Sequence, residues 1–243
     1  MNKSVYTLIL IIISAHITFS QSAEEYLLKG NFMHSVGKFK DAISMYDKAI
    51  KLKPDYYDAY ILRASERLIT FDAAGSMEDC QKLIELGPER DSSYLSRALA
   101  YTYLNDFENS NKDLFKALEL RNDNPLTYNA LAMNYGKLKQ DSISIYYNTK
   151  AIELNPNLLE AYVGRALVYR NSKMFEEAIK DYDKILELNP DYFMAYSGRA
   201  ICYNETGQYE KAIADWEILI RKMPAMESVI KPRMDEARKK ISK

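Results

Sequence analysis

Apolar residues recur at helical spacing through most of the chain, and residues 161–190 show the pattern most clearly. The first half of this stretch places Tyr162, Ala166 and Tyr169 at offsets of four and seven, so that they share one helical face. The second half repeats the same offsets from Ala178 onward, and a short polar turn separates the two halves. The pattern predicts two helices whose apolar faces pack against each other.

The same pattern repeats along the chain with a period of 34 residues. A tyrosine marks the fourth residue of every copy: Tyr26, Tyr60, Tyr94, Tyr128, Tyr162 and Tyr196. A small residue follows four positions later, where two helices must approach closely: Gly30, Ala64, Ala98, Ala132, Ala166 and Ala200. A proline, which cannot continue a helix, closes most copies: Pro54, Pro88, Pro156, Pro190 and Pro224. The third copy departs, with Asn122 at that place and Pro125 three residues later.

This pattern resembles the tetratricopeptide repeat, a helix–turn–helix unit of about 34 residues. The resemblance divides the chain into six copies, at residues 23–56, 57–90, 91–124, 125–158, 159–192 and 193–224. It implies an all-α fold, a right-handed α-solenoid, because one helical pair cannot hide its apolar face and stacks on its neighbours.

The second helices of the copies fit the family pattern unequally. A small residue followed by an aromatic one stands at the expected places in copies one, five and six, as Ala42 and Tyr46, Ala178 and Tyr182, and Ala212 and Trp216. Copy two carries Ser76 and Cys80 there instead. In copy four we expect a turn compressed around Gly136, which would shift Tyr146 and Tyr147 out of register with Ala151.

The two ends of the chain differ from the repeats. Residues 1–22 carry Lys3 ahead of the apolar run Leu8–Ile13, which is too short to span a membrane and is typical of a signal peptide. We expect cleavage near Ser20 and an exported protein, periplasmic or secreted, with an uncleaved anchor as the alternative. Residues 225–243 predict a C-terminal capping helix, with regular helix beginning only at Pro232 and with apolar residues at helical spacing: Ile230, Met234, Ala237 and Ile241.

Charge and cysteine content narrow the possible partners and cross-links. Lys and Arg total 33 against 34 Asp and Glu, so the chain has no bulk positive charge with which to neutralise a nucleic acid. The only cysteines, Cys80 and Cys202, lie more than three repeats apart, which is too far for a disulfide in a solenoid. We interpret both as small buried apolar side chains.

An arginine and an aspartate occur together in four of the copies. The arginines stand at position seven and the aspartates at position 23, as Arg63 with Asp79, Arg97 with Asp113, Arg165 with Asp181 and Arg199 with Asp215. The other two copies lack both residues, since copy one has Lys29 and Met45 and copy four has Leu131 and Tyr147. This co-occurrence predicts salt bridges within the repeats, although inheritance through duplication would also keep the residues together.

The resemblance also implies a binding surface, because the first helices of the family line a concave groove that holds peptide segments. Positions five and nine of that groove correspond here to Leu27, Asn31, Ile61, Ser65, Leu95, Leu99, Asn129, Met133, Val163, Leu167, Ser197 and Ile201. This mostly apolar stripe favours a protein or peptide partner with an amphipathic helix or extended hydrophobic segment. Alternatively, some of these side chains close against adjacent helices, or the groove mediates self-association. Only Asn31 fits a carboxylate clamp, so we expect none.

The sequence contains no catalytic pattern that we can assemble. His34 is the only histidine after the N-terminal segment, so neither a zinc cluster nor a histidine-dependent triad is expected, and no glycine-rich phosphate loop is present. We expect no enzyme activity and no cofactor. The sequence favours a scaffold or adaptor that binds another protein, and the alternative is an envelope protein that holds a glycan or small polar ligand on its tyrosines.

Overall fold

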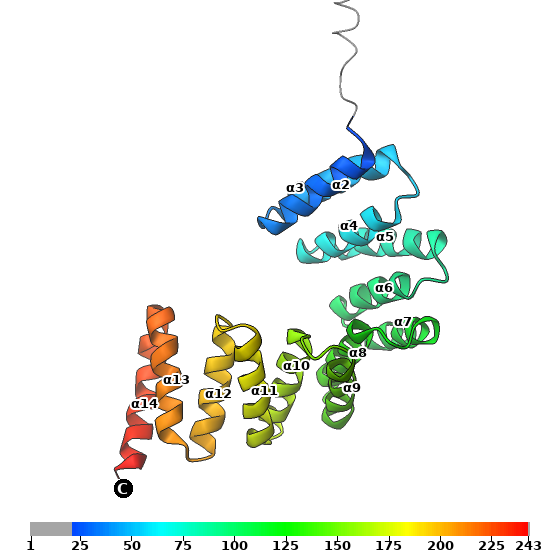
Figure 1. Cartoon of the computed structure of the whole chain (residues 1–243). Coiled ribbons are helices and arrows are strands. Elements are labelled where there is room, and N and C mark those ends of the chain that lie inside the picture. The colour runs from blue at the N-terminus through cyan, green and yellow to red at the C-terminus, as the bar shows by residue number, and fades with distance from the viewer. Residues whose placement is uncertain (1–20, 243) are drawn as a thin grey trace, which may run out of the picture. The chain divides into compact units, whose positions relative to one another are not determined.

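The computed structural model describes residues 21–242, and these form helices joined by short turns (Figure 1). The signal-peptide prediction falls almost entirely outside the described residues. The helices of the repeats are α2 (Ala23–Ser35), α3 (Phe39–Leu52), α4 (Tyr57–Ile69), α5 (Ala73–Leu86), α6 (Asp91–Tyr103), α7 (Phe107–Leu120), α8 (Pro125–Lys137), α9 (Asp141–Leu154), α10 (Leu159–Asn171), α11 (Phe175–Leu188), α12 (Phe193–Glu205) and α13 (Tyr209–Lys222). The predicted all-α fold of helix–turn–helix repeats is confirmed, and residues 21–242 contain no strand.

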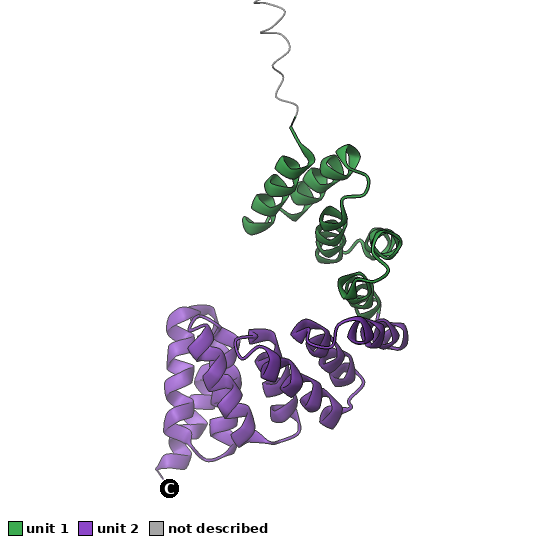
Figure 2. Ribbon diagram, turned by 45° about the vertical axis from the view of Figure 1, so that its right-hand side comes forward, with its two compact units in different colours: residues 1–104 green, residues 105–243 purple. Residues whose placement is uncertain are grey.

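The chain forms two compact units, one ending at Leu104 and the other beginning at Asn105 (Figure 2). The first unit contains α2 to α6 and the second contains α7 to α14. Within each unit, neighbouring helices pack against one another through the small and aromatic residues of the repeat pattern.

The turn inside each helical pair has the same backbone conformation. The second residue after the helix lies at a positive φ between 57° and 76° in the six turns after α2, α4, α6, α8, α10 and α12. Two of these residues are glycines, Gly37 and Gly207, which adopt this region without strain. The others, Phe71, Asn105, Lys139 and Lys173, take it because the turn geometry demands it at this place.

The expected compression of the turn in copy four is wrong. The helices α8 and α9 start 34 residues before α10 and α11, and Lys139 occupies the usual left-handed place in the turn between them. Ser144, Asn148 and Ala151 are consequently the buried residues of α9, where Ala178, Tyr182 and Ile185 are buried in α11. Backbone geometry kept the register, whereas we had aligned the chain on its aromatic residues.

The tyrosines at position four hold equivalent places. They are buried or half-buried, and four of them donate a hydroxyl hydrogen bond to the carbonyl oxygen six residues earlier. These bonds measure 3.0–3.3 Å and run from Tyr60 to Pro54, from Tyr128 to Asn122, from Tyr162 to Pro156 and from Tyr196 to Pro190. Each bond satisfies a carbonyl in the loop that ends the preceding pair, so the tyrosines have a structural role.

Three of the predicted arginine–aspartate pairs are confirmed, each as a two-pronged contact. The closest nitrogen–oxygen distances are 2.5 Å for Arg63 and Asp79, 2.7 Å for Arg165 and Asp181, and 2.7 Å for Arg199 and Asp215. Burial alone would lower the pKa of Arg165, but the hydrogen bond and charge of Asp181 outweigh it and hold that pKa above its ordinary value. The fourth pair, Arg97 and Asp113, belongs to two different units and stays a prediction.

Each of these arginines also contacts the preceding helical pair, which the sequence pattern did not reveal. The Nη1 atom reaches Asp47 at 2.5 Å from Arg63, Thr149 at 2.9 Å from Arg165 and Asp183 at 2.6 Å from Arg199. The guanidinium therefore joins two neighbouring pairs as well as the two helices of its own pair.

The C-terminal helix packs on the last pair but starts earlier than expected. A short 3₁₀ turn, η1 (Pro224–Met226), leads directly into α14 (Glu227–Ile241), so Pro232 lies inside the helix and not in its first turn. Ile230, before the proline, is 4% exposed and packs with Met234 and Ala237 in a cluster that includes Trp216 of α13. This burial holds the first turns helical despite the proline. Ile241 is exposed, so it does not contribute to the packing.

Candidate functional site

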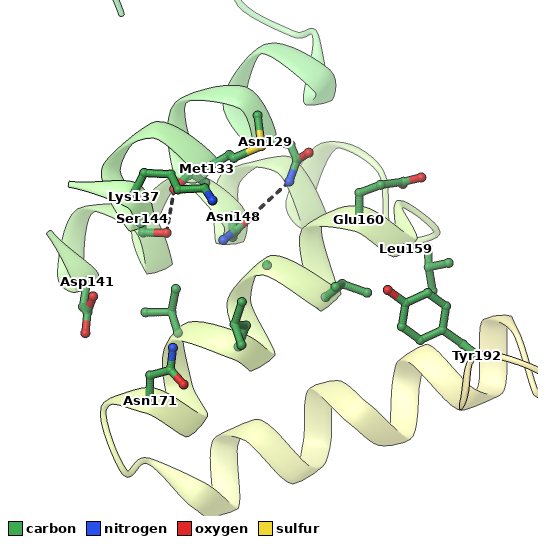
Figure 3. A pocket seen from close by; sticks show the side chains of 16 residues that line it. Asn129, Met133, Lys137, Asp141, Ser144, Asn148, Leu159, Glu160, Asn171 and Tyr192 are labelled. Atoms are coloured by element: carbon green, nitrogen blue, oxygen red, sulfur yellow. Dashed lines mark hydrogen bonds between the residues drawn. The ribbon is translucent and has the colours of Figure 1, made fainter. Parts of the chain in front are cut away.

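The second unit contains a pocket of about 570 Å³ between α8, α9 and α10 (Figure 3). Helix α8 contributes one wall, α10 the opposite wall, and α9 the floor. The residues that line it are Asn129, Ala132, Met133, Gly136, Lys137, Asp141, Ser144, Asn148, Leu159, Glu160, Val163, Gly164, Leu167, Val168, Asn171 and Tyr192.

The pocket brings together four of the predicted groove residues. Asn129 and Met133 come from α8, and Val163 and Leu167 come from α10, one repeat later. Met133 and Leu167 are each almost half exposed, at 44% and 45%, although both are large apolar side chains. Together with Val163 they give both walls of the pocket apolar surface that is open to solvent.

The floor of the pocket is polar and is built from two amide side chains. Asn129 donates from Nδ2 to Oδ1 of Asn148 at 3.2 Å, and Asn148 is only 1% exposed. Beside them, the buried Ser144 hydroxyl donates to the Ala132 carbonyl oxygen at 2.7 Å. These bonds satisfy groups that would be costly to bury alone, so the floor is a fixed arrangement.

Charged and polar groups form the rim. Lys137 lies near one end of the pocket and Glu160 near the other (Figure 3). Asp141 accepts a hydrogen bond from the Ser172 hydroxyl at 2.6 Å, which fixes the carboxylate at the turn end of α9. The site therefore combines apolar side chains, an amide floor and a charged rim, with Lys137 and Asp141 on one side and Glu160 on the other (Figure 3).

The other predicted groove residues are placed unequally. In the second unit, Ser197 and Ile201 are half-buried on α12 and do not line this pocket. In the first unit, Leu27 and Ile61 are half-buried, Asn31, Ser65 and Leu99 are exposed, and Leu95 is 9% exposed. Asn31 accepts a hydrogen bond from the Tyr46 hydroxyl at 2.9 Å. Leu95 thus fits the alternative interpretation, in which a stripe residue closes against adjacent helices.

Two residues of the site, Asn148 and Gly164, were missed by the sequence analysis. Asn148 stands 34 residues before Tyr182, so the repeat register alone could have identified it as a small polar side chain where four other copies carry a large one and copy two carries Cys80. Gly164 faces it, because a Cβ atom at Gly164 would lie 3.2 Å from both the nitrogen and the oxygen of the Asn148 amide. Our mistaken register in copy four hid this pair.

Possible metal ligands and the two thiols were located among the described residues. Within residues 21–242 no three His, Cys, Asp or Glu side chains gather as a metal site. Cys80 and Cys202 are fully buried, as predicted, and burial raises the pKa of the Cys202 thiol to about 11. Across the same residues no helix combines the length and apolar character that crossing a membrane requires.

The fold and the pocket together define a helical repeat protein with a groove between its first helices. Comparison with family models places the repeats: tetratricopeptide repeat models match residues 159–192, residues 181–214, and residues 23–56 and 91–124. The chain therefore carries tetratricopeptide repeats. No curated protein matches the sequence.

Solved structures show the same fold at low sequence identity. A chain of the APC/C hetero-tetramer Cut9–Hcn1 has a TM-score of 0.79 at 18% identity over 96% of this chain. The match spans 46% of that chain, less than half its length. YrrB, described as a TPR protein with an unusual peptide-binding site, has a TM-score of 0.55 at 22% identity over 74% of this chain and 92% of its own. PilF from Pseudomonas aeruginosa has a TM-score of 0.69 at 15% identity, covering 83% and 92% of the two chains.

Proposed function

We propose that the chain is a non-catalytic scaffold or adaptor whose six repeats hold a segment of another protein along their first helices. The observation that carries this proposal is the pocket between α8 and α10, where Asn129, Met133, Val163 and Leu167 meet. All four stand at positions five and nine of their repeats, which the resemblance assigns to the groove.

The chemistry of the pocket suits a peptide segment. Protein sites for such ligands are concave and mostly apolar, with a few placed polar groups that fix orientation. Here Met133 and Leu167 offer apolar contact, and the amides of Asn129 and Asn148 offer hydrogen bonds to a polar group of the segment. YrrB shares the fold and has a peptide-binding site of its own, which supports the proposal by analogy of fold only.

The alternative, a glycan or small polar ligand stacked on tyrosines, has weaker support. It would need the rings at position four to be available, yet these are buried or half-buried. Four of their hydroxyl groups are also engaged with loop carbonyl oxygens. We therefore favour the protein partner.

Photo-crosslinking tests the proposed function. We would replace Met133 with the photoreactive residue benzoylphenylalanine and, as a matched control, Leu154 of α9, because their side chains are 44% and 43% exposed. We expect a crosslinked protein from native cells at position 133 and not at position 154. Adding Leu167→Lys should abolish that product, since a charge would enter the apolar wall.

Equal crosslinking at both positions, or a product at position 133 that survives Leu167→Lys, would contradict a partner held in this groove. Circular dichroism of each variant checks that the helices are intact.

We also propose that the protein is exported after cleavage near Ser20, on the support of Lys3 and the short apolar run Leu8–Ile13. N-terminal sequencing of the protein purified from its native cells tests this. A first residue near Gln21 is expected, and recovery of the uncut N-terminus from the cytoplasmic fraction would refute the proposal.

A further inference from the structure

We propose that the pocket between α8 and α10 receives a tyrosine side chain from an extended segment of the partner protein. This inference rests on the proposed function and adds the chemistry of the bound residue. It follows from the repeat itself, because the neighbouring repeat shows what occupies the equivalent space.

In the next repeat that space is filled by the protein's own tyrosine. Tyr182 of α11 lies against Gly198 of α12, and a Cβ atom at Gly198 would lie 2.3 Å from the ring carbon Cζ. The ring is 6% exposed, so it is fully packed there. The equivalent residues one repeat earlier are Asn148 and Gly164, each 34 positions before. The glycine that makes room for a ring is therefore present, and the ring is absent.

A second change enlarges the same space. Gly136 stands 34 residues before Arg170, so α8 has no side chain where α10 carries a long one. Gly136 and Gly164 both line the pocket. Two large side chains of one repeat are thus replaced by a glycine and an asparagine in the other, and the pocket is the volume that they would have taken.

The floor offers a hydrogen bond to an oxygen atom at the end of such a ring. The Oδ1 atom of Asn148 accepts from the Nδ2 atom of Asn129 at 3.2 Å, so the amide nitrogen of Asn148 takes no part in that bond. An amide nitrogen carries two N–H donors, which can point to a ligand in the pocket. A tyrosine hydroxyl is an acceptor as well as a donor, so it satisfies this group where a phenylalanine ring would not.

The charges at the rim complement an extended segment. Lys137 and Glu160 lie near opposite ends of the pocket (Figure 3), and neither forms an ion pair within the part of the chain that the structure describes. A segment with its tyrosine in the pocket would pass both groups. We therefore expect a basic side chain on the Glu160 side of that tyrosine, whereas Asp141 offsets the charge of Lys137 on the other side.

The test uses p-cresol, which is the isolated side chain of tyrosine, and toluene, which lacks its hydroxyl group. NMR of the full mature chain would follow the Met133 methyl group and the side-chain amides of Asn129 and Asn148. We expect saturable shifts at these groups with p-cresol, and binding of toluene that is weaker by about tenfold, the equivalent of about 1.4 kcal/mol for the lost hydrogen bond.

Asn148→Tyr supplies the missing ring from the chain itself, as Tyr182 does one repeat later, and should abolish p-cresol binding. Ser142→Tyr is the matched control, because it adds the same ring to an exposed place on α9 outside the pocket and should leave binding unchanged. Shifts spread over the whole protein, or equal binding to Asn148→Tyr, would overturn the inference.

If Asn148→Tyr fails to fold, the p-cresol and toluene titrations of the unaltered protein still decide, through the location of the shifts and the preference for the hydroxyl group. The two proposals fail differently. Loss of p-cresol binding with crosslinking at position 133 retained would reject the tyrosine and keep the groove, whereas p-cresol binding without a crosslinked protein would reject the partner.

Discussion

The pairs α8/α9 and α10/α11 share helix lengths, spacing and turn geometry, but they join their two helices differently. In α10/α11, Arg165 pairs with Asp181, and its guanidinium lies 5.8 Å from each of the rings of Tyr162 and Tyr169. In α8/α9 the place of the arginine is taken by the fully buried Leu131. The aspartate is replaced by Tyr147.

Tyr147 takes over the position between the two tyrosines of its pair. Its ring lies 6.3 Å from that of Tyr128 and 5.6 Å from that of Tyr135, stacked on both at interplanar angles of 28° and 20°. Tyr128 and Tyr135 correspond to Tyr162 and Tyr169 one repeat later. The ring of Tyr147 therefore lies between Tyr128 and Tyr135 as the Arg165 guanidinium lies between Tyr162 and Tyr169. The comparison indicates that the repeat requires a planar group between these two tyrosines and does not require the ion pair.

The same two pairs also differ in the side chain that their second helix packs against the first helix of the next repeat. Tyr182 fills that space after α10/α11, and Asn148 leaves it open after α8/α9. The space after α10/α11 is thus filled by a packed ring, whereas the equivalent space after α8/α9 is an open pocket. Three predictions test this comparison.

Removing only the arginine should have the largest effect. Arg165→Leu leaves Asp181, whose side chain is 6% exposed, buried without its partner, at a cost of about 3 kcal/mol in the free energy of unfolding. The double variant Arg165→Leu/Asp181→Tyr copies α8/α9 and should recover to within about 1 kcal/mol of the unaltered protein, because a new ring stacks between Tyr162 and Tyr169. Urea unfolding followed by circular dichroism measures both.

A double variant as unstable as the single one would show that the aromatic cage of α8/α9 depends on other features of that pair.

Replacing two equivalent glycines by alanine should change the stability of the protein by an intermediate amount, and more at one glycine than at the other. Gly198→Ala forces a Cβ atom against the packed ring of Tyr182 and should cost about 2 kcal/mol. Gly164→Ala meets only the Asn148 amide at 3.2 Å, and the higher helix propensity of alanine, about 1 kcal/mol, offsets the contact. Thermal unfolding of the two variants compares them. Equal losses would mean that the space beside Asn148 is as tightly filled as that beside Tyr182.

The smallest effect should appear at alkaline pH. Burial raises the pKa of Tyr182 to about 12 from an ordinary 10.0, so the neutral phenol is favoured in the folded state. Its contribution to stability is complete below pH 10 and is lost as the pH rises through 12, with about 1.4 kcal/mol gone near pH 11. Tyr182→Phe should remove this part of the pH dependence.

Urea unfolding at pH 8 and pH 11 checks this prediction. The protein with Tyr182 and the Tyr182→Phe variant should both carry Cys202→Ala, because burial raises the pKa of that thiol to about 11 and it titrates in the same pH range. Tyr146→Phe is the control, since that ring is exposed. A pH dependence that Tyr182→Phe leaves unchanged would contradict the prediction.

The repeat framework could be predicted because it depends on local periodicity. Six tyrosines at equal spacing located every helical pair to within a few residues, and the co-occurrence of Arg63, Arg165 and Arg199 with their aspartates identified three real ion pairs. Both signals are properties of single positions counted along the chain.

The pocket gives no such signal, because it results from side chains that are small or missing at repeat positions. In copy four the neighbouring Tyr146 and Tyr147 favour a wrong alignment, whereas the informative residue is Asn148, 34 residues before Tyr182. Leu95 illustrates the converse error, since a groove position by count is buried by packing. The contacts of the arginines with Asp47, Thr149 and Asp183 were also missed, because they depend on how one pair stacks on the next.

The two cysteines provide the protein with built-in reporters. Cys80 lies in the first unit and Cys202 in the second, and both thiols are fully shielded in the native state. A thiol-specific label can reach either sulfur only when the surrounding helices separate. The labelling rates at the two sites, resolved by mass spectrometry, would therefore measure how often each half of the chain opens, without any engineered probe.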